Sequence, residues 1–187
     1  MKLLLFIALL FVLMGCAQSD SNDGFKRLDF GKFTIEVPPS WQKLNEIGID
    51  SDVGGIITDH SDTLRFDLGW YSNKLTEDEP VIIERSELEN LYDGRDTGGF
   101  IIVEDMQHIN AGDYLRNLIV WDTIDGRKAK IVYPKKSGNG LTGIYIDSLW
   151  IAGSGIDRFN MYGNHLKPEN EKLFLDAIKT LKFYKKR

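Results

Sequence analysis

The stretch that decides the fold is HLKPENEKLFLDAIKTLKF, residues 165–183. Pro168 suits the first turn of a helix, and Glu169 and Glu171 suit the positive end of its dipole, as Lys179 and Lys182 suit the negative end. The apolar side chains then recur every three or four residues and form one stripe, which consists of Leu173, Phe174, Ala177, Ile178 and Leu181. The stretch therefore predicts a helix that lays one apolar face on a sheet.

Upstream of this helix, alternating apolar and polar residues predict strands. Residues 33–37 alternate until Pro38-Pro39, which ends the strand, and residues 54–58 and 63–71 flank a turn-like segment. Residues 117–124 and 127–133 are joined by Asp125-Gly126, the dipeptide that best suits a type I′ hairpin. Residues 141–151 carry apolar side chains on both faces, which indicates a central strand covered on both sides. Residues 159–162 add a short strand.

The segment from residue 77 to residue 90 is read less clearly. Residues 81–83 suit a strand, and residues 85–92 suit a short helix. No internal repeat and no second domain boundary is visible. The predicted fold class is therefore α+β, an antiparallel β-sheet with a C-terminal helix packed on it, in one domain over residues 25–187.

Composition argues against a nucleic-acid partner and against an internal disulfide. The chain has 187 residues, of which 42% are hydrophobic, and its formal net charge is −5. Binding to nucleic acid needs a surplus of positive charge, so nucleic acid is not expected as a partner. The chain has a single cysteine, which excludes an internal disulfide.

The first sixteen residues predict where the protein resides. Lys2 precedes an apolar run over residues 3–14, which as a helix would reach about 18 Å and is too short to span a bilayer. Residues 1–15 are therefore predicted to be a signal peptide. The run ends in Leu13-Met14-Gly15-Cys16, which resembles the lipobox of bacterial lipoproteins, and Cys16 is the only cysteine.

This resemblance implies transfer of diacylglycerol to the Cys16 thiol and cleavage before Cys16. Acyl chains on Cys16 would make the membrane a partner, because two or three chains hold a protein firmly. Residues 16–24 would then be the lipidated cysteine and a flexible polar tether. Ala17 stands where aspartate commonly signals inner-membrane retention, so the outer membrane is favoured in a cell with two membranes. An ordinary signal peptide or an uncleaved anchor is the alternative.

The order of elements carries a second resemblance. An opening strand that ends in Pro38-Pro39-Ser40-Trp41, a run of antiparallel strands and the terminal stretch at residues 165–183 resemble the PsbP-like fold. That group includes photosystem II subunit P, Mog-type Ran-binding proteins and DcrB-type bacterial lipoproteins. The resemblance spans roughly residues 30–183 and implies a non-enzymatic accessory or binding protein, but it transfers no ligand residue.

Three short motifs suggest chemistry, and each has a plainer interpretation. Residues 138–143, GNGLTG, match GxGxxG after Lys135-Lys136, but a strand-like segment follows where dinucleotide binding needs a helix, so residues 134–143 are predicted to be a mobile loop. Asp96-Thr97-Gly98 matches the aspartic-protease triplet, but no second triplet exists. Ser154 lacks the elbow motif of serine hydrolases.

Histidine spacing argues against a metal site, since His60, His108 and His165 lie far apart in the sequence. His60 between Asp59 and Asp62 would make at most a weak ion site. The four tryptophans could line a groove, but core packing is the favoured interpretation of all of them: Trp41, Trp70, Trp121 and Trp150. The acidic residues of the segment 77–89 could form a docking face for a basic partner, although a solvated edge is the default.

These observations predict a lipid-anchored, exported, non-catalytic binding or accessory module of the bacterial cell envelope. An envelope protein partner is expected, and no cofactor, metal or catalytic residue is assigned. Two alternatives remain. One is an envelope hydrolase with a site of scattered Asp, Ser and His residues, and the other is a structural lipoprotein with no small-molecule ligand.

Overall fold

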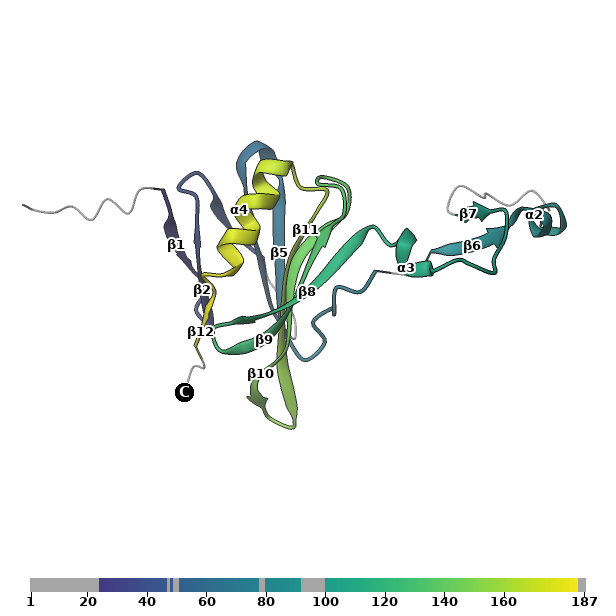
Figure 1. Cartoon of the computed structure of the whole chain (residues 1–187). Helices are drawn as coiled ribbons and strands as arrows, with labels where there is room; N and C mark the ends of the chain where they lie inside the picture. The colour runs from purple at the N-terminus through teal and green to yellow at the C-terminus, as the bar shows by residue number, and fades with distance from the viewer. Residues whose placement is uncertain (1–23, 47, 49–50, 78–79, 92–99, 185–187) are drawn as a thin grey trace, which may run out of the picture.

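A seven-stranded antiparallel sheet forms the centre of the molecule (Figure 1). The computed structural model describes residues 24–46, 48, 51–77, 80–91 and 100–184. The strands in spatial order are β3 (Gln42–Asn45), β4 (Asp52–Ile57), β5 (Thr63–Gly69), β11 (Gly155–Asn164), β10 (Leu141–Ala152), β9 (Arg127–Pro134) and β8 (Asn117–Ile124). The predicted strands and the β8–β9 hairpin are confirmed, and β10 lies inside the sheet as expected.

A second layer covers one face of this sheet. It consists of a three-stranded sheet of β1 (Lys26–Asp29), β2 (Phe33–Val37) and β12 (Lys182–Phe183), together with the helix α4 (Pro168–Ile178) (Figure 1). The helix begins at Pro168 as predicted and buries Phe174, Ala177 and Ile178. It ends at Ile178, so the prediction that Lys182 lies near the helix end is wrong, because the chain has already turned into β12.

The main core lies between these two layers and is rich in phenylalanine. The ring of Phe33 in β2 lies 4.9 Å from that of Phe159 in β11, and Phe159 lies 5.0 Å from Phe183 in β12, both edge to face. Such ring pairs add to the free energy gained from burial. Sequence-distant strands of both sheets are thus held by one aromatic cluster.

The Pro38-to-Trp41 corner joins the start of the large sheet to the helix. Trp41 is fully buried, and its Nε1 donates to the carboxylate of Asp59 at 3.3 Å. Asp59 opens the 3₁₀ turn η1 (Asp59–Ser61), after which the Asp62 carboxylate accepts from Asn170 Nδ2 in α4 at 2.8 Å. Three segments therefore meet in one partly buried polar cluster.

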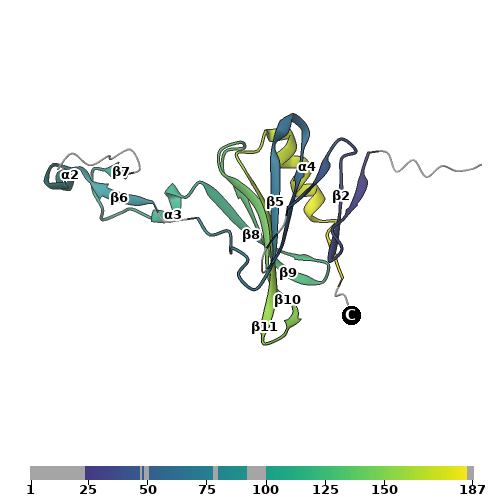
Figure 2. The same cartoon turned by 180° about the vertical axis from the view of Figure 1, so that it is seen from behind.

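Residues 70–77 form a strap across the other face of the large sheet, which is seen from behind in Figure 2. Asn160 Nδ2 donates to the carbonyl of Asn73 at 3.0 Å, and Lys130 Nζ donates to the carbonyl of Leu75 at 3.3 Å. Leu75 packs there with Val132 and Tyr145 in a small second core. This strap leads the chain from β5 to the next group of elements.

That group projects away from the large sheet, and we call it the arm (Figures 1 and 2). It consists of β6 (Val81–Glu84), α2 (Arg85–Leu91), β7 (Phe100–Val103) and α3 (Ala111–Tyr114). The strand at 81–83 and the short helix after it are confirmed. β6 and β7 are parallel, which departs from the antiparallel pattern elsewhere.

Glu77 fastens the base of the arm. Its Oε1 accepts from the Arg116 backbone N–H at 2.8 Å, and its Oε2 accepts from the N–H of Asn117 at 2.9 Å.

None of the described helices is long and apolar enough to cross a membrane. The α+β fold class is confirmed, while residues 1–15 and Cys16 lie outside the described residues.

Candidate functional site

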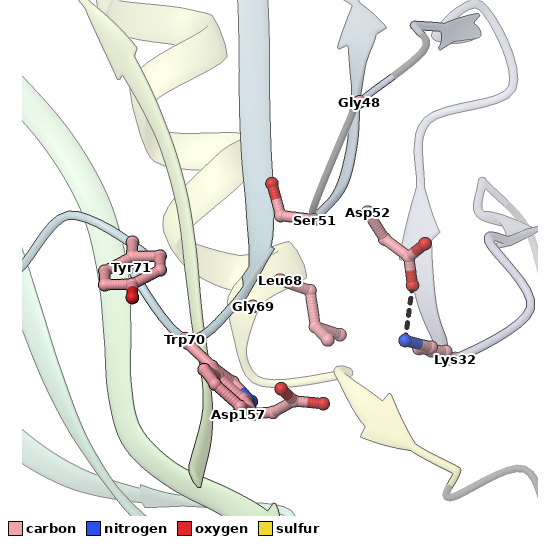
Figure 3. A pocket seen from close by; sticks show the side chains of 9 residues that line it. All are labelled: Lys32, Gly48, Ser51, Asp52, Leu68, Gly69, Trp70, Tyr71 and Asp157. Carbon is pink, nitrogen blue, oxygen red and sulfur yellow. Dashed lines mark ion pairs between the residues drawn. The ribbon is translucent and has the colours of Figure 1, made fainter. Parts of the chain in front are cut away.

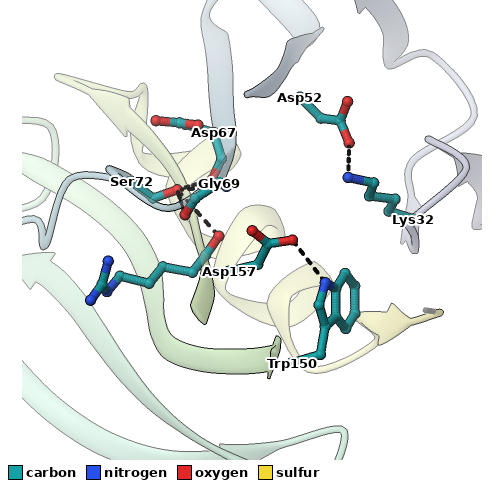
Figure 4. Close-up of polar contacts among 8 residues, drawn as sticks. Lys32, Asp52, Asp67, Gly69, Ser72, Trp150 and Asp157 are labelled. Atoms are coloured by element: carbon teal, nitrogen blue, oxygen red, sulfur yellow. Dashed lines mark hydrogen bonds and ion pairs between the residues drawn. The ribbon is translucent and has the colours of Figure 1, made fainter. Parts of the chain in front are cut away.

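An open pocket of about 570 Å³ lies at one end of the interface between the two sheets (Figure 3). Lys32 and Asp52 form an ion pair of 2.7 Å on one wall. Asp157 lines the pocket and accepts from Trp150 Nε1 at 2.8 Å, as Figure 4 shows. The aromatic side chains of Trp70 and Tyr71 flank it and are exposed.

Both carboxylates of this pocket already have a partner. The Asp52 carboxylate forms an ion pair with Lys32, and the Asp157 carboxylate accepts a hydrogen bond from the Trp150 indole and not from a histidine. Ser51 lines the pocket, yet no described residue accepts a hydrogen bond from its hydroxyl. A nucleophile needs a base within hydrogen-bond reach, so this geometry does not favour acyl transfer.

Ser72 is the most connected hydroxyl near the pocket (Figure 4). Its Oγ accepts from the Gly69 N–H at 3.1 Å and lies 3.0 Å from the carbonyl of Asp67 and 3.2 Å from that of Arg158. A serine that bonds only backbone groups fixes a turn. Ser72 therefore holds the turn that carries Trp70 and Tyr71.

The strand predicted to follow the GxGxxG match is confirmed, but the loop predicted over residues 134–143 is shorter, because β9 ends at Pro134 and residues 141–143 belong to β10. Leu141 already begins β10, and the Gly138 N–H donates to the Glu171 carboxylate at 3.1 Å. Lys135 Nζ donates to the carbonyls of Gly112 and Asp113 at the surface of the molecule. The pattern reflects turn geometry and packing.

The histidines are not brought together. His60 lies in η1 with φ of 60°, and His165, with φ of 50°, donates its backbone N–H to Gly140 before α4. His108 is exposed, 3.9 Å from Asp105. Among the described residues, no three His, Cys, Asp or Glu side chains are placed to hold a metal ion. Asp96-Thr97-Gly98 lies outside the described residues.

The tryptophans do not form one groove. Trp41 is in the core, as expected, and Trp150 is partly buried against it. Trp70 packs over the β10–β11 turn, where a side chain on Gly155 would meet its ring at 2.7 Å, which explains the glycine beside Ser154. The interpretation of Trp70 and Trp121 as core residues is wrong, because they are 38% and 55% exposed.

Trp121 belongs to a feature that the sequence did not predict: β8 is the last strand of the large sheet and pairs only with β9. We call residues 118–123 of this edge strand the β8 edge. The exposed fractions are 41% for Leu118, 51% for Ile119, 44% for Val120 and 55% for Trp121. Alternate residues of a strand point to opposite faces, so apolar side chains are exposed on both faces at once.

The two edges of the large sheet differ in chemistry. β3, at the far edge, has only four residues and carries Gln42, Lys43 and Asn45, which blunt an edge against further pairing. β8 has eight residues, and Asp122 is the one charged side chain in it. A long apolar edge with free backbone groups is a ready template for another strand. The β8 edge is therefore the candidate binding site.

The signal in the sequence was the run Leu118-Ile119-Val120-Trp121. It shares with residues 141–151 the apolar character on both faces that predicts a central strand. Only the strand order distinguishes the two, because β10 has a neighbour on each side and β8 has one.

Comparison of the chain with protein-family models finds no match, and a search of curated proteins also finds none.

Proposed function

We propose that the protein is a lipid-anchored, non-catalytic binding or accessory module of the bacterial cell envelope, held at the membrane through Cys16. The anchor rests on the apolar run and the lipobox-like Leu13-Met14-Gly15-Cys16. The polar stretch after Cys16 would let the folded domain stand clear of the headgroups. An outer-membrane location is part of the same proposal, because Ala17 follows the lipidated position.

The binding role is carried by one observation, the apolar β8 edge. A soluble surface normally avoids such an edge, because unpaired strand groups beside apolar side chains promote association. A tethered protein also raises the effective concentration of a contact, so a modest interaction suffices for a role at the envelope.

Membership of the PsbP-like group is proposed as the finer fold assignment. Support comes from three features: strand β2, the corner from Pro38 to Trp41 that it leads into, and the α4–β12 ending. Members of that group are mostly accessory or binding proteins, which agrees with the role proposed here. An experimental structure with different connectivity would contradict this assignment.

The anchor is tested by replacing Cys16 and labelling growing cells with a radioactive fatty acid. Cys16→Ala should abolish the label and leave the unprocessed precursor, because no other residue offers a thiol. Ser19→Ala, in the predicted tether, is the matched control and should retain label and processing. Unchanged labelling of Cys16→Ala would reject the anchor.

The binding role is tested by placing a photoreactive amino acid at position 121 or, as a control, at the exposed turn residue Ser154. Irradiation of intact cells should give crosslinked products from position 121 and far fewer from position 154. If both positions behave alike, the β8 edge is not a binding site.

A further inference from the structure

The backbone of β8 presents hydrogen-bonding groups outward at alternate residues. The hairpin turn has two residues, so the backbones of Ile124 and Arg127 form a hydrogen-bonded pair. Counting back from Ile124, every second residue of β8 directs its backbone N–H and C=O groups toward β9. The Lys135 N–H to Arg116 carbonyl bond of 2.7 Å agrees with this phase. The N–H and C=O groups of Ile119 and Trp121 consequently point away from the sheet.

The ends of this open edge are already engaged. The outward N–H of Asn117 donates to Glu77, and the N–H of Thr123 donates to the side chain of Asp122 at 2.7 Å. In the described part of the chain, no group bonds the outward N–H and C=O of Ile119 and Trp121. The free segment is therefore centred on Val120.

We propose that the β8 edge binds the β8 edge of a second copy of this chain, antiparallel and about a two-fold axis at Val120. In this register Ile119 lies opposite Trp121 of the partner, and the reverse pair is equivalent. The free groups of these two residues then form four hydrogen bonds between the copies. The inference rests on the binding role proposed for the β8 edge and names its occupant.

Side chains on both faces fit this register. Ile119 and Trp121 share one face, so each Trp121 ring covers an Ile119 of the other copy, an aromatic–aliphatic pair of the kind that stabilises sheets. Val120 meets Val120 of the partner on the opposite face, beside Leu118. Apolar side chains that are exposed in one copy thus contact apolar side chains of the other copy on both faces of the joint sheet.

Charge complementarity favours a second copy over an unrelated strand. Arg116 and Asp122 are both exposed and flank the apolar run. Among the described residues, neither side chain forms an ion pair. The proposed register places Arg116 diagonal to Asp122 of the partner, about 7–8 Å between backbones and within reach of an arginine. The symmetry repeats this pair at the other end.

Disulfide formation tests both the dimer and its register. In the full chain carrying Cys16→Ser, Val120→Cys supplies the only thiol, so the result does not depend on lipidation. Val120 and its copy would form a non-hydrogen-bonded pair about 4.5 Å apart, within disulfide range. Ile119→Cys is the matched control, because its copies would lie about 7–8 Å apart.

Mild oxidation followed by non-reducing electrophoresis should give about tenfold more covalent dimer from Val120→Cys than from Ile119→Cys. Equal yields, a preference for Ile119→Cys or no dimer would overturn the proposal. If dimer is absent while position 121 still crosslinks to a protein of another mass in cells, the proposed function survives and only the second copy is wrong.

Ile119→Pro is the second variant. Its ring removes an outward N–H that β9 does not use, and proline is tolerated on a strand edge in that position. Adding Ile119→Pro to Val120→Cys should reduce the disulfide dimer about tenfold, with an unchanged circular dichroism spectrum. Retention of the dimer would contradict strand pairing as its basis.

Discussion

Asp125 is the residue on which the β8–β9 turn depends. It has a φ of 49°, which favours asparagine, aspartate or glycine. Its carboxylate accepts from the Phe183 N–H at 3.0 Å and lies 2.6 Å from Arg127 and 3.4 Å from Lys182. Burial raises the pKa of Asp125, but the bond from Phe183 and the charges of Lys182 and Arg127 outweigh it and hold the pKa below 3.8.

We expect Asp125→Asn to destabilise the protein by about 1 kcal/mol at neutral pH, because it keeps the turn and removes only the charge. The lowered pKa means that the carboxylate contributes stability above 3.8, which is lost as the pH falls through the folded pKa. The difference from wild type should therefore shrink in acid. Urea unfolding at neutral pH and near pH 3 measures it, and a difference that does not change with pH would contradict this assignment.

Tyr145 carries a buried hydroxyl that bonds to no described residue. Tyr145→Phe should therefore change the free energy of unfolding by less than about 1 kcal/mol. Burial raises the pKa of Tyr145 above 10.0, with Arg158 lowering it and Asp147 raising it. The neutral form is favoured in the fold, so this contribution is present below pH 10 and lost above it.

The phenylalanine variant should thus lose less stability than wild type when the pH rises past 10, as measured by urea unfolding. Tyr71→Phe, at an exposed position, is the control and should follow wild type. Identical alkaline behaviour of wild type and Tyr145→Phe would contradict the assignment.

At the scale of elements, the arm is joined to the large sheet through Glu77. Glu77→Ala removes the carboxylate that accepts from two backbone N–H groups and from Asn117 Nδ2. Amide hydrogen exchange at residues 116 and 117 should become at least about tenfold faster, since losing one charged hydrogen bond costs about 1.5–3 kcal/mol. Glu87→Ala, on the exposed face of α2, should leave exchange there unchanged. Equal rates in both variants would show that Glu77 does not hold the arm.

Most long elements were predictable, because their periodicity is local. The alternation in β2, the Asp125-Gly126 turn and the apolar stripe of α4 each lie within one short stretch. The short strands β1, β3 and β7 were not predicted, since four residues give too little pattern and their pairing comes from distant segments.

The candidate site was less accessible to prediction. Trp121 and Trp41 were both predicted to be core residues, yet one is exposed and the other buried. What separates them is the neighbour across the sheet, which is a property of topology and not of local pattern. No role was predicted for the histidines or Ser154, because their chemistry needs spacings that the sequence lacks.

At the scale of the whole molecule, pairing between copies links stability to concentration. If β8 pairs only in the folded state, the free energy of unfolding of the dimer should rise by about 1.4 kcal/mol for each tenfold increase in protein concentration. Thermal unfolding over a range of concentrations measures this. Ile119→Pro should abolish the dependence, and a wild-type midpoint that does not move with concentration would contradict it.

The difference between β3 and β8 has a consequence for the size of the assembly. A sheet in which both edge strands can pair with another molecule would extend into a filament. Here the β8 edge is long and apolar, whereas the β3 edge is short and polar. Pairing β8 with β8 of a second copy therefore leaves only the two β3 edges open. In the proposed dimer, growth would stop at two molecules, and the two proposed lipid anchors would hold it to the membrane without the hazard of polymerisation.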